Sequence, residues 1–273
     1  MKKVIITPFF LYAIACLVLP ACMKDGYDPN WRAECRIQQL KGDLIILKND
    51  SAVFAYNAKG DPVSVTKSTP ATGFPNYLFR YDTKRRLTEF IGIYYDGLHY
   101  EFRHRYGHDL KGRIIKDTVY TFAALTDPLE TVHKEFIYNY TYDDQNRIIG
   151  IETLHVPTGT RSASQYFYNQ QGNLERITGP SGETVPQYDN KVNMHRTHPI
   201  WQFIDRDFSV NNPFQAVAYN SRGLPVALQS PACTYGTNFI GIYYNQVEVS
   251  YQCRGAAPGM PGHIDWPDNS CPQ

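Results

Sequence analysis

The segment Tyr142-Asp-Asp-Gln-Asn146-Arg-Ile148-Ile-Gly-Ile151 decides the fold of this chain. The side chain of Asp143 can accept hydrogen bonds from the backbone that follows it, and Asn146 tolerates the positive φ that a tight reversal requires. On both sides of this turn, apolar and aromatic residues alternate with polar ones. A period of two with β-branched and aromatic side chains is typical of strands, so the segment predicts a β-hairpin.

Five further segments repeat this order of an aromatic residue, Asn or Asp, and then Gly, Asn or Arg before apolar residues resume. They are Tyr56–Val63, Tyr81–Leu87, the looser copy Tyr106–Ile114, Tyr168–Leu174 and Tyr219–Val226. The first five copies along the chain lie roughly 25 to 35 residues apart, which is room for two strands and two turns.

These repeats predict an all-β fold, a long antiparallel meander of about 14 strands built from hairpin repeats. No run of ten or more residues has helical periodicity with capping signals, so we expect little helix. So many strands in one twisted sheet curl. We therefore expect a strongly curved open sheet or a partial barrel.

The N-terminal residues predict where the protein is located in the cell. Residues 1–21 have a basic start and an apolar run, and they end in Leu19-Pro20-Ala21 before Cys22. This order is typical of a secretory leader. The alternative is an ordinary cleavage site with a coincidental cysteine beside it.

The junction before Cys22 resembles the bacterial lipobox, which implies that Cys22 carries lipid and anchors the protein to a membrane. The following Lys24 and Asp25 resemble the export signal of Bacteroidetes-type lipoproteins. That resemblance implies an outer-membrane lipoprotein and favours the cell surface over the periplasmic face. We divide the rest into a short linker (22–34), one β domain (35–254) with an insertion (179–213), and a Pro- and Gly-rich tail (255–273).

Two motifs resemble known families. The segment beginning at Tyr142 resembles the YD repeat of Rhs-type proteins. Tyr188-Asp-Asn-Lys-Val-Asn193 with Asn211-Asn212 resembles segments of Bacteroidetes lipoproteins of unknown function that have a porin-like β fold. Together the resemblances cover about residues 35–252 and imply architecture and location. Six copies without a long shell or a C-terminal toxin do not imply toxin encapsulation.

The charge balance bears on nucleic-acid binding, and the cysteines bear on disulfide pairing. The chain has 27 Lys and Arg against 26 Asp and Glu, so it has no basic field for nucleic acid. Four cysteines remain besides Cys16 of the leader and Cys22, and four allow three pairings. Because Cys233 and Cys253 flank an apparent hairpin, we expect Cys233–Cys253 and Cys35–Cys271; free buried thiols are the alternative.

The sequence contains no spacing that is diagnostic of an active site, so we predict neither an enzyme nor a cofactor. His195 and His198, with a carboxylate from Asp189, Asp205 or Asp207, have the side chains that could hold zinc. Surface histidines are the simpler interpretation, and we predict no metal. We interpret His104 and His108 as solvent or turn residues.

The insertion contains the polar residues of most interest. They either bond the backbone of a crossing loop or contact a polar ligand on the concave side of the sheet. These residues are Tyr188, Asp189, Lys191, Asn193, Asn211 and Asn212. Most of the 21 Tyr and 14 Phe are expected to fill the core, and an aromatic binding platform would draw on Trp201 and its loop.

Together these observations predict a monomeric, lipid-anchored envelope protein that acts as a non-catalytic binding module for a glycan or an envelope protein. The first alternative is a structural envelope component whose repeats serve spacing or assembly. The second is a hydrolase that uses residues 188–213.

Replacing Cys22 by Ser tests the predicted anchor. Because the thiol is the acylation site, C22S should abolish incorporation of labelled fatty acid and membrane fractionation. The control C16S alters only the leader and should leave labelling intact. Undiminished labelling of C22S would refute the lipoprotein prediction.

Overall fold

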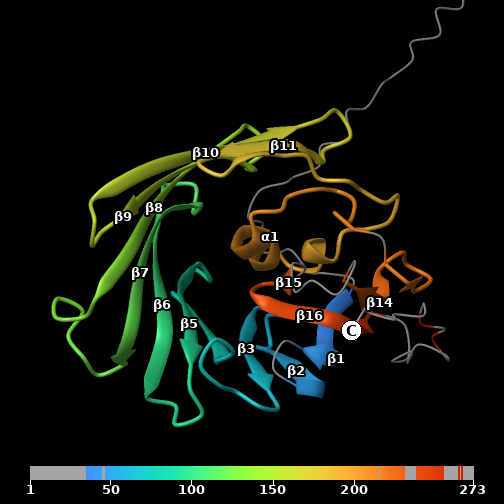
Figure 1. Cartoon of the computed structure of the whole chain (residues 1–273), viewed down its shortest axis with the longest axis horizontal. Coiled ribbons are helices and arrows are strands. Elements are labelled where there is room, and N and C mark those ends of the chain that lie inside the picture. Colours follow the sequence, from blue (N-terminus) through green and yellow to red (C-terminus); the bar gives the residue numbers. More distant parts are fainter. Residues whose placement is uncertain are drawn as a thin grey trace, which may run out of the picture.

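The computed structural model describes residues 35–254 apart from 45–46, 215 and 231–237, together with Ile264 and Trp266 (Figure 1). The predicted leader, Cys22, the linker, Cys233, Cys271 and the rest of the tail lie outside the described residues.

One antiparallel sheet forms the body of the protein. Its strands are β1 Cys35–Leu44, β2 Leu47–Tyr56, β3 Pro62–Lys67, β4 Asn76–Tyr81, β5 Leu87–Ile93, β6 His99–His108, β7 Ile114–Ala124, β8 Lys134–Tyr142, β9 Ile148–His155, β10 Thr160–Tyr168, β11 Leu174–Gly179, β12 Gly182–Thr184, β13 Ala218–Tyr219, β14 Pro225–Gln229 and β16 Ile242–Cys253. The short β15 Asn238–Phe239 pairs with β16. The predicted all-β meander is confirmed.

The sheet is open and strongly curved. From β1 to β12 every strand pairs with its neighbours in the sequence, and β16, β14 and β13 continue the sheet on the other side of β1. The edges are therefore β12 and β13. Figure 1 shows the sheet bending around a 3₁₀ helix, η1 Met194–Thr197, and a short α-helix, α1 Pro199–Asp205. No helix in the described part has the length and apolar character needed to cross a bilayer.

Six connections share one hydrogen-bond pattern, and we call them the repeat turns. They span residues 57–61, 82–86, 109–113, 143–147, 169–173 and 220–224. The amide of the first residue donates to the carbonyl of the fifth, and the amide of the fourth donates to the carbonyl of the first. The side-chain oxygen of the first residue, always Asn or Asp, accepts from the amide of the fifth.

The fourth residue of every repeat turn has a φ between 60° and 93°. Glycine adopts this left-handed conformation without a steric penalty, and Asn tolerates it. Four turns have Gly there, Asn146 takes the position in the fourth turn, and Arg85 takes it in the second. The recurring turn in the sequence is therefore a specific backbone geometry.

The looser copy needs realignment. Its turn begins at Asp109, so the residue before the turn is His108 rather than Tyr106. Tyr106 instead lies on the concave face of the sheet beside Phe203 of α1. In this copy a histidine takes the place of the tyrosine before the turn, which explains why the copy departs from the pattern of the others.

The tyrosines before the turns tie consecutive hairpins together. The hydroxyl of Tyr142, at the end of β8, donates to the carbonyl of Ile114 at the start of β7 at 2.6 Å. Tyr81 donates in the same way to Pro62, and Tyr56 and Tyr168 donate to the corresponding carbonyls of Ile37 and Ile148. Each bond fixes one repeat turn against the preceding strand.

The concave side holds the main core. The ring of Trp201 in α1 is fully buried and makes edge contacts with Phe54 of β2, Phe79 of β4 and Phe239 of β15, with centroids 5.5 to 5.9 Å apart. The prediction of an aromatic platform at Trp201 is therefore wrong, because this ring joins the insertion to the sheet.

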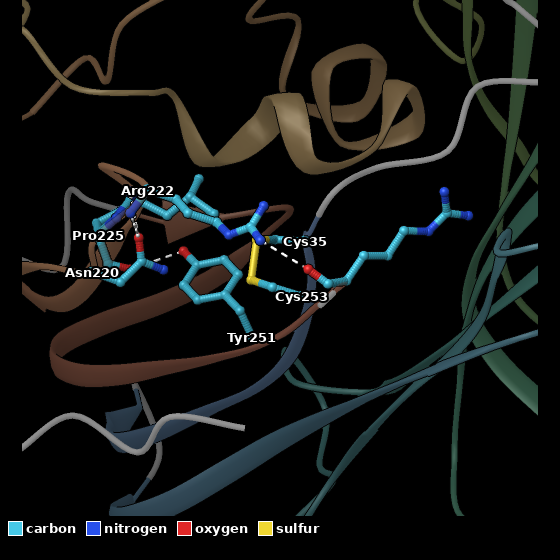
Figure 2. The surroundings of a disulfide bond; sticks show 8 residues. Cys35, Asn220, Arg222, Pro225, Tyr251 and Cys253 are labelled. Atoms are coloured by element: carbon cyan, nitrogen blue, oxygen red, sulfur yellow. Dashed lines mark hydrogen bonds between the residues drawn. A yellow bond between two sulfur atoms is a disulfide. The ribbon is translucent and has the colours of Figure 1, made fainter. Parts of the chain in front are cut away.

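The expected disulfide pairs are also wrong. Cys35 bonds Cys253, because β16 pairs with β1 and the register places these two residues opposite each other (Figure 2). Neither Cys233–Cys253 nor Cys35–Cys271 is compatible with this bond. Beside it, the hydroxyl of Tyr251 donates to the carbonyl of Pro225, which fixes β14 against β16.

Replacing Asp143 by Ala tests the repeat turn. Because the variant loses two backbone bonds and the pairing with Arg147, it should lower the free energy of unfolding by about 1 to 2 kcal/mol. The adjacent Asp144 is exposed and makes none of these bonds, so D144A is a matched control with an expected change within about 0.5 kcal/mol. Equal losses in urea unfolding of both variants would contradict this role.

Candidate functional site

The insertion crosses the concave side of the sheet and is held by its own polar side chains. Asp189 accepts from the amide of Lys191 at 2.8 Å, from Asn212 at 3.1 Å and from the hydroxyl of Tyr219 at 2.5 Å. The buried Asn193 caps η1 and donates to Asp207 at 2.8 Å. These carboxylates and amides are thus engaged within the loop.

The remaining insertion residues are similarly engaged. The hydroxyl of Tyr188 bonds Ser209 at 2.9 Å. Asn211 exchanges two bonds with Asn173 and donates to the carbonyl of Lys191, so the insertion is attached to the repeat turn 169–173. Of the predicted contact residues, only Lys191 has an exposed side chain among those described.

His195 and His198 are buried, so the surface position expected for them is wrong. His195 bonds Asp205 through Nε2 at 2.6 Å and Asn193 through Nδ1 at 2.8 Å. His198 caps α1, its ring nitrogen accepts from the amide of Ile200, and burial lowers the pKa of His198 to about 3. No metal-binding group of three His, Cys, Asp or Glu occurs among residues that the structure describes.

A cleft lies between the concave face of β4–β8 and the segment formed by α1 and the β15–β16 turn. Its free volume is about 280 Å³. It is lined by Gly73, Pro75, Tyr77, Phe90, Glu101, Phe102, His104, Tyr106, Asp117, Tyr140, Phe203, Ile204, Asp205, Arg206, Ile240 and Gly241. Six aromatic rings thus surround a few polar groups, which is the usual composition of a binding pocket.

The central polar group of the cleft is Asp117 on β7. Its Oδ2 bonds Nδ1 of His104 at 2.8 Å and lies 3.5 Å from the hydroxyl of Tyr140. Its Oδ1 is buried and accepts no hydrogen bond within the described part of the chain. A buried oxygen of this kind is costly to leave unsatisfied, so it indicates a position for a donor from a ligand.

Three further charged side chains line the cleft. Glu101 accepts from the amide of Gly73 at 2.7 Å and from the hydroxyl of Tyr94 at 3.1 Å. Asp205 accepts from His195 and from the amide of Ile240 at 2.8 Å. Arg206 ends α1 with a φ of 56°, and its guanidinium lies 5.0 Å from the ring centroid of Tyr138.

The side of the cleft at Tyr77 is supported by a buried amine. Nζ of Lys67 lies 3.8 Å from the ring centroid of Tyr77 and 4.0 Å from that of Phe74. Burial lowers the pKa of Lys67 to about 7, against the opposing effect of Glu101 and Asp50. The aromatic side chains here are therefore fixed by contact with Lys67.

The cleft combines flat apolar surfaces with carboxylate acceptors. The aromatic rings can stack on the C–H faces of a sugar, and Asp117 can accept from a hydroxyl. Sequence reasoning missed Asp117 and interpreted His104 as a solvent or turn residue, although its side chain bonds Asp117. One signal was present, because Asp117 and the apolar Val119 are two residues apart on a strand, so their side chains lie on the same face of the sheet, and both are buried.

Comparisons with known proteins give similarities of fold. No family model and no curated protein matches the chain. Its structure is similar to a porin-like protein from Bacteroides uniformis, with 12% identity over 83% of this chain and 99% of that one and a TM-score of 0.46. It is also similar to a chain in the TcdB2–TccC3–Cdc42 structure, with 18% identity over 75% of this chain and 12% of that one and a TM-score of 0.30.

The free energy of unfolding should depend on pH through His195, which lies in the insertion behind the cleft. Burial favours neutral His195, but Asp205 and Asp207 outweigh it and raise its pKa above 6.5. The stabilisation is therefore fully present below pH 6.5 and is lost as pH rises through the folded-state pKa. The difference in unfolding free energy between the unaltered chain and H195Q should be largest below pH 6.5 and shrink above it.

Urea unfolding from pH 5.5 upward measures this difference. His133 has a side chain that is 57% exposed and pairs with Glu135, so H133Q is the matched control and should show little effect. A destabilisation of H195Q that does not change with pH would contradict the charged state assigned to His195.

Proposed function

We propose that this chain is a lipid-anchored envelope protein, that it acts as a non-catalytic binding module, and that its concave cleft binds a glycan. The observation that carries this proposal is the buried Oδ1 of Asp117, which lacks a donor among the described residues and lies among aromatic rings. A sugar offers both hydroxyl donors and apolar faces to such a site.

A glycan fits the cleft better than a protein surface does. Stable protein interfaces bury about 800 Å² on each partner, which is far more surface than a small cleft offers. The cleft has about 280 Å³ of free volume, which is near the lower end of small-molecule sites. An end or a branch of a chain of sugars matches these dimensions.

The non-catalytic part of the proposal is supported by the side chains that could act as acids or bases. Both ring nitrogens of His195 already bond protein groups, and its side chain is 5% exposed. The ring of His104 is fixed by Asp117, and the carboxylates of Glu101 and Asp205 already accept hydrogen bonds from protein groups. The described lining contains no Ser, Thr or Cys that could serve as a nucleophile. A hydrolase that uses residues 188–213 would need His195 to be released from Asp205.

The envelope location rests on the leader and on Cys22, and we place the protein on the outer face of the outer membrane. A glycan-binding module there would meet polysaccharides outside the cell. Protease treatment of intact cells separates this face from the periplasmic one. If the protein is instead a structural envelope component, it should bind no glycan.

A glycan array with the mature chain carrying C22S tests the proposal, and we expect binding to a defined set of sugars. D117N keeps the shape of the side chain but removes its charge, so it should weaken binding at least about tenfold. The control is E152Q, because Glu152 is exposed on β9 and does not line the cleft. Melting temperatures establish that both variants remain folded.

Two results would count against this function. If no sugar on the array binds, the glycan proposal fails and the structural alternative gains support. If a sugar binds but E152Q weakens it as much as D117N does, the cleft is not the site.

A further inference from the structure

The two ends of the sheet differ in charge. Because strands alternate in direction along the meander, every second connection lies at the same end, and all six repeat turns lie at the end that holds the Cys35–Cys253 disulfide. We call this the repeat-turn end. The described connections of four or more residues at the opposite end span 68–75, 94–98, 125–133 and 156–159.

The repeat-turn end is cationic near Cys35. The four turns nearest to it, 57–61, 82–86, 109–113 and 220–224, contain seven Lys or Arg against three Asp. The four connections at the opposite end contain two Asp and one Glu and no Lys or Arg. The connections at the two ends of the sheet therefore differ in the sign of their charge, although the chain is almost neutral overall.

Much of the excess charge comes from lysines at one position of the turn. Arg85, Arg86 and Arg113 pair with Asp61, Asp82 and Asp109, respectively, at 2.7 Å, so these charges largely cancel. Exposed lysines occupy the third position of three neighbouring turns, and their ammonium groups contact no carboxylate within the described structure. They are Lys59, Lys84 and Lys111.

These lysines lie at the tips of their turns, where their side chains are exposed. In the first two turns the lysine amide donates to the Asn or Asp at the first position, which holds the lysine at the tip. Strands lie about 4.8 Å apart, so turns two strands apart present a charge about every 10 Å. Leu110, next to Lys111, is also fully exposed at this tip.

The chain leading to the predicted lipid begins at this end. Twelve residues lie between Cys22 and Cys35, the first residue of β1, so thirteen Cα-to-Cα steps join them. At most about 3.5 Å per residue, they span no more than about 45 Å. An anchor at Cys22 therefore keeps the repeat-turn end within reach of the bilayer.

From this arrangement we propose that the repeat-turn end docks on an anionic bilayer surface through Lys59, Lys84 and Lys111. The proposal extends the lipid-anchored function proposed above and fixes the orientation of the domain. The opposite end, with its acidic connections, faces away from the lipid, and the exposed Leu110 contacts the headgroup region. Lysines near an anionic surface each raise the binding constant by about fivefold, so three of them have a large combined effect.

Vesicle sedimentation with the mature chain carrying C22S tests docking of the repeat-turn end in the absence of the acyl anchor. We expect the chain to bind vesicles that contain phosphatidylglycerol in phosphatidylcholine, to bind phosphatidylcholine alone much less, and to be released by high salt. Reversal of the three lysines, K59E/K84E/K111E, should weaken binding at least about tenfold.

The matched control is K41E/K134E/R161E, which changes the net charge equally but lies on strands nearer the opposite end. It should weaken binding less than about threefold. Docking is refuted if the C22S chain does not bind anionic vesicles, or if both triple variants lose binding equally. Acylation of Cys22 and glycan binding are measured separately, so failure here leaves those proposals standing.

Discussion

The structure depends on one local interaction. In each repeat turn, the side-chain oxygen of the first residue, an Asn or Asp, accepts a hydrogen bond from a backbone amide of the same turn. In the turn 143–147 the carboxylate of Asp143 accepts hydrogen bonds from the backbone amides of Gln145 at 3.0 Å and Arg147 at 2.9 Å. This closes the reversal within five residues, so the two adjoining strands have a fixed register. At four of the six turns the tyrosine before the turn also donates to a carbonyl of the preceding strand, so one hairpin positions the next.

Repetition of this unit explains the curvature and the site. A long antiparallel meander twists steadily, and here the concave side receives the insertion as its core. Trp201 fills the centre of that side, and Phe203 and Asp205 extend the same short helix to the edge of the cleft. The cleft is therefore the space left where the insertion does not fully cover β4–β8.

Much of the fold could be predicted from the sequence because the turn chemistry is local. Asn or Asp followed three residues later by Gly or Asn identifies the reversal, and alternation identifies the strands. The alignment at Tyr106 failed because an aromatic residue was used as the reference point instead of Asp109. The disulfide could not be read from spacing, since Cys35 and Cys253 are 218 residues apart and meet only through the pairing of β1 with β16.

The site was less predictable because its residues meet through long-range strand pairing rather than through local turn chemistry. His104 and Asp117 lie on β6 and β7 and meet through the register of two long strands, which no motif records. The polar residues of the insertion were conspicuous in the sequence, yet they bond mostly within the loop. Asp117 was inconspicuous in the sequence, because an inward carboxylate is unusual only once the concave side is known.

Hydrogen exchange measured residue by residue tests most directly whether the repeat turns organise the sheet. The amide at the fifth position, such as that of Arg147, donates to the side chain that opens the turn, whereas the amide of Asp144 has no acceptor among the described residues. In all six turns we predict that the fifth amide exchanges at least about a hundredfold more slowly than the second. Equal, rapid exchange at both positions would contradict it.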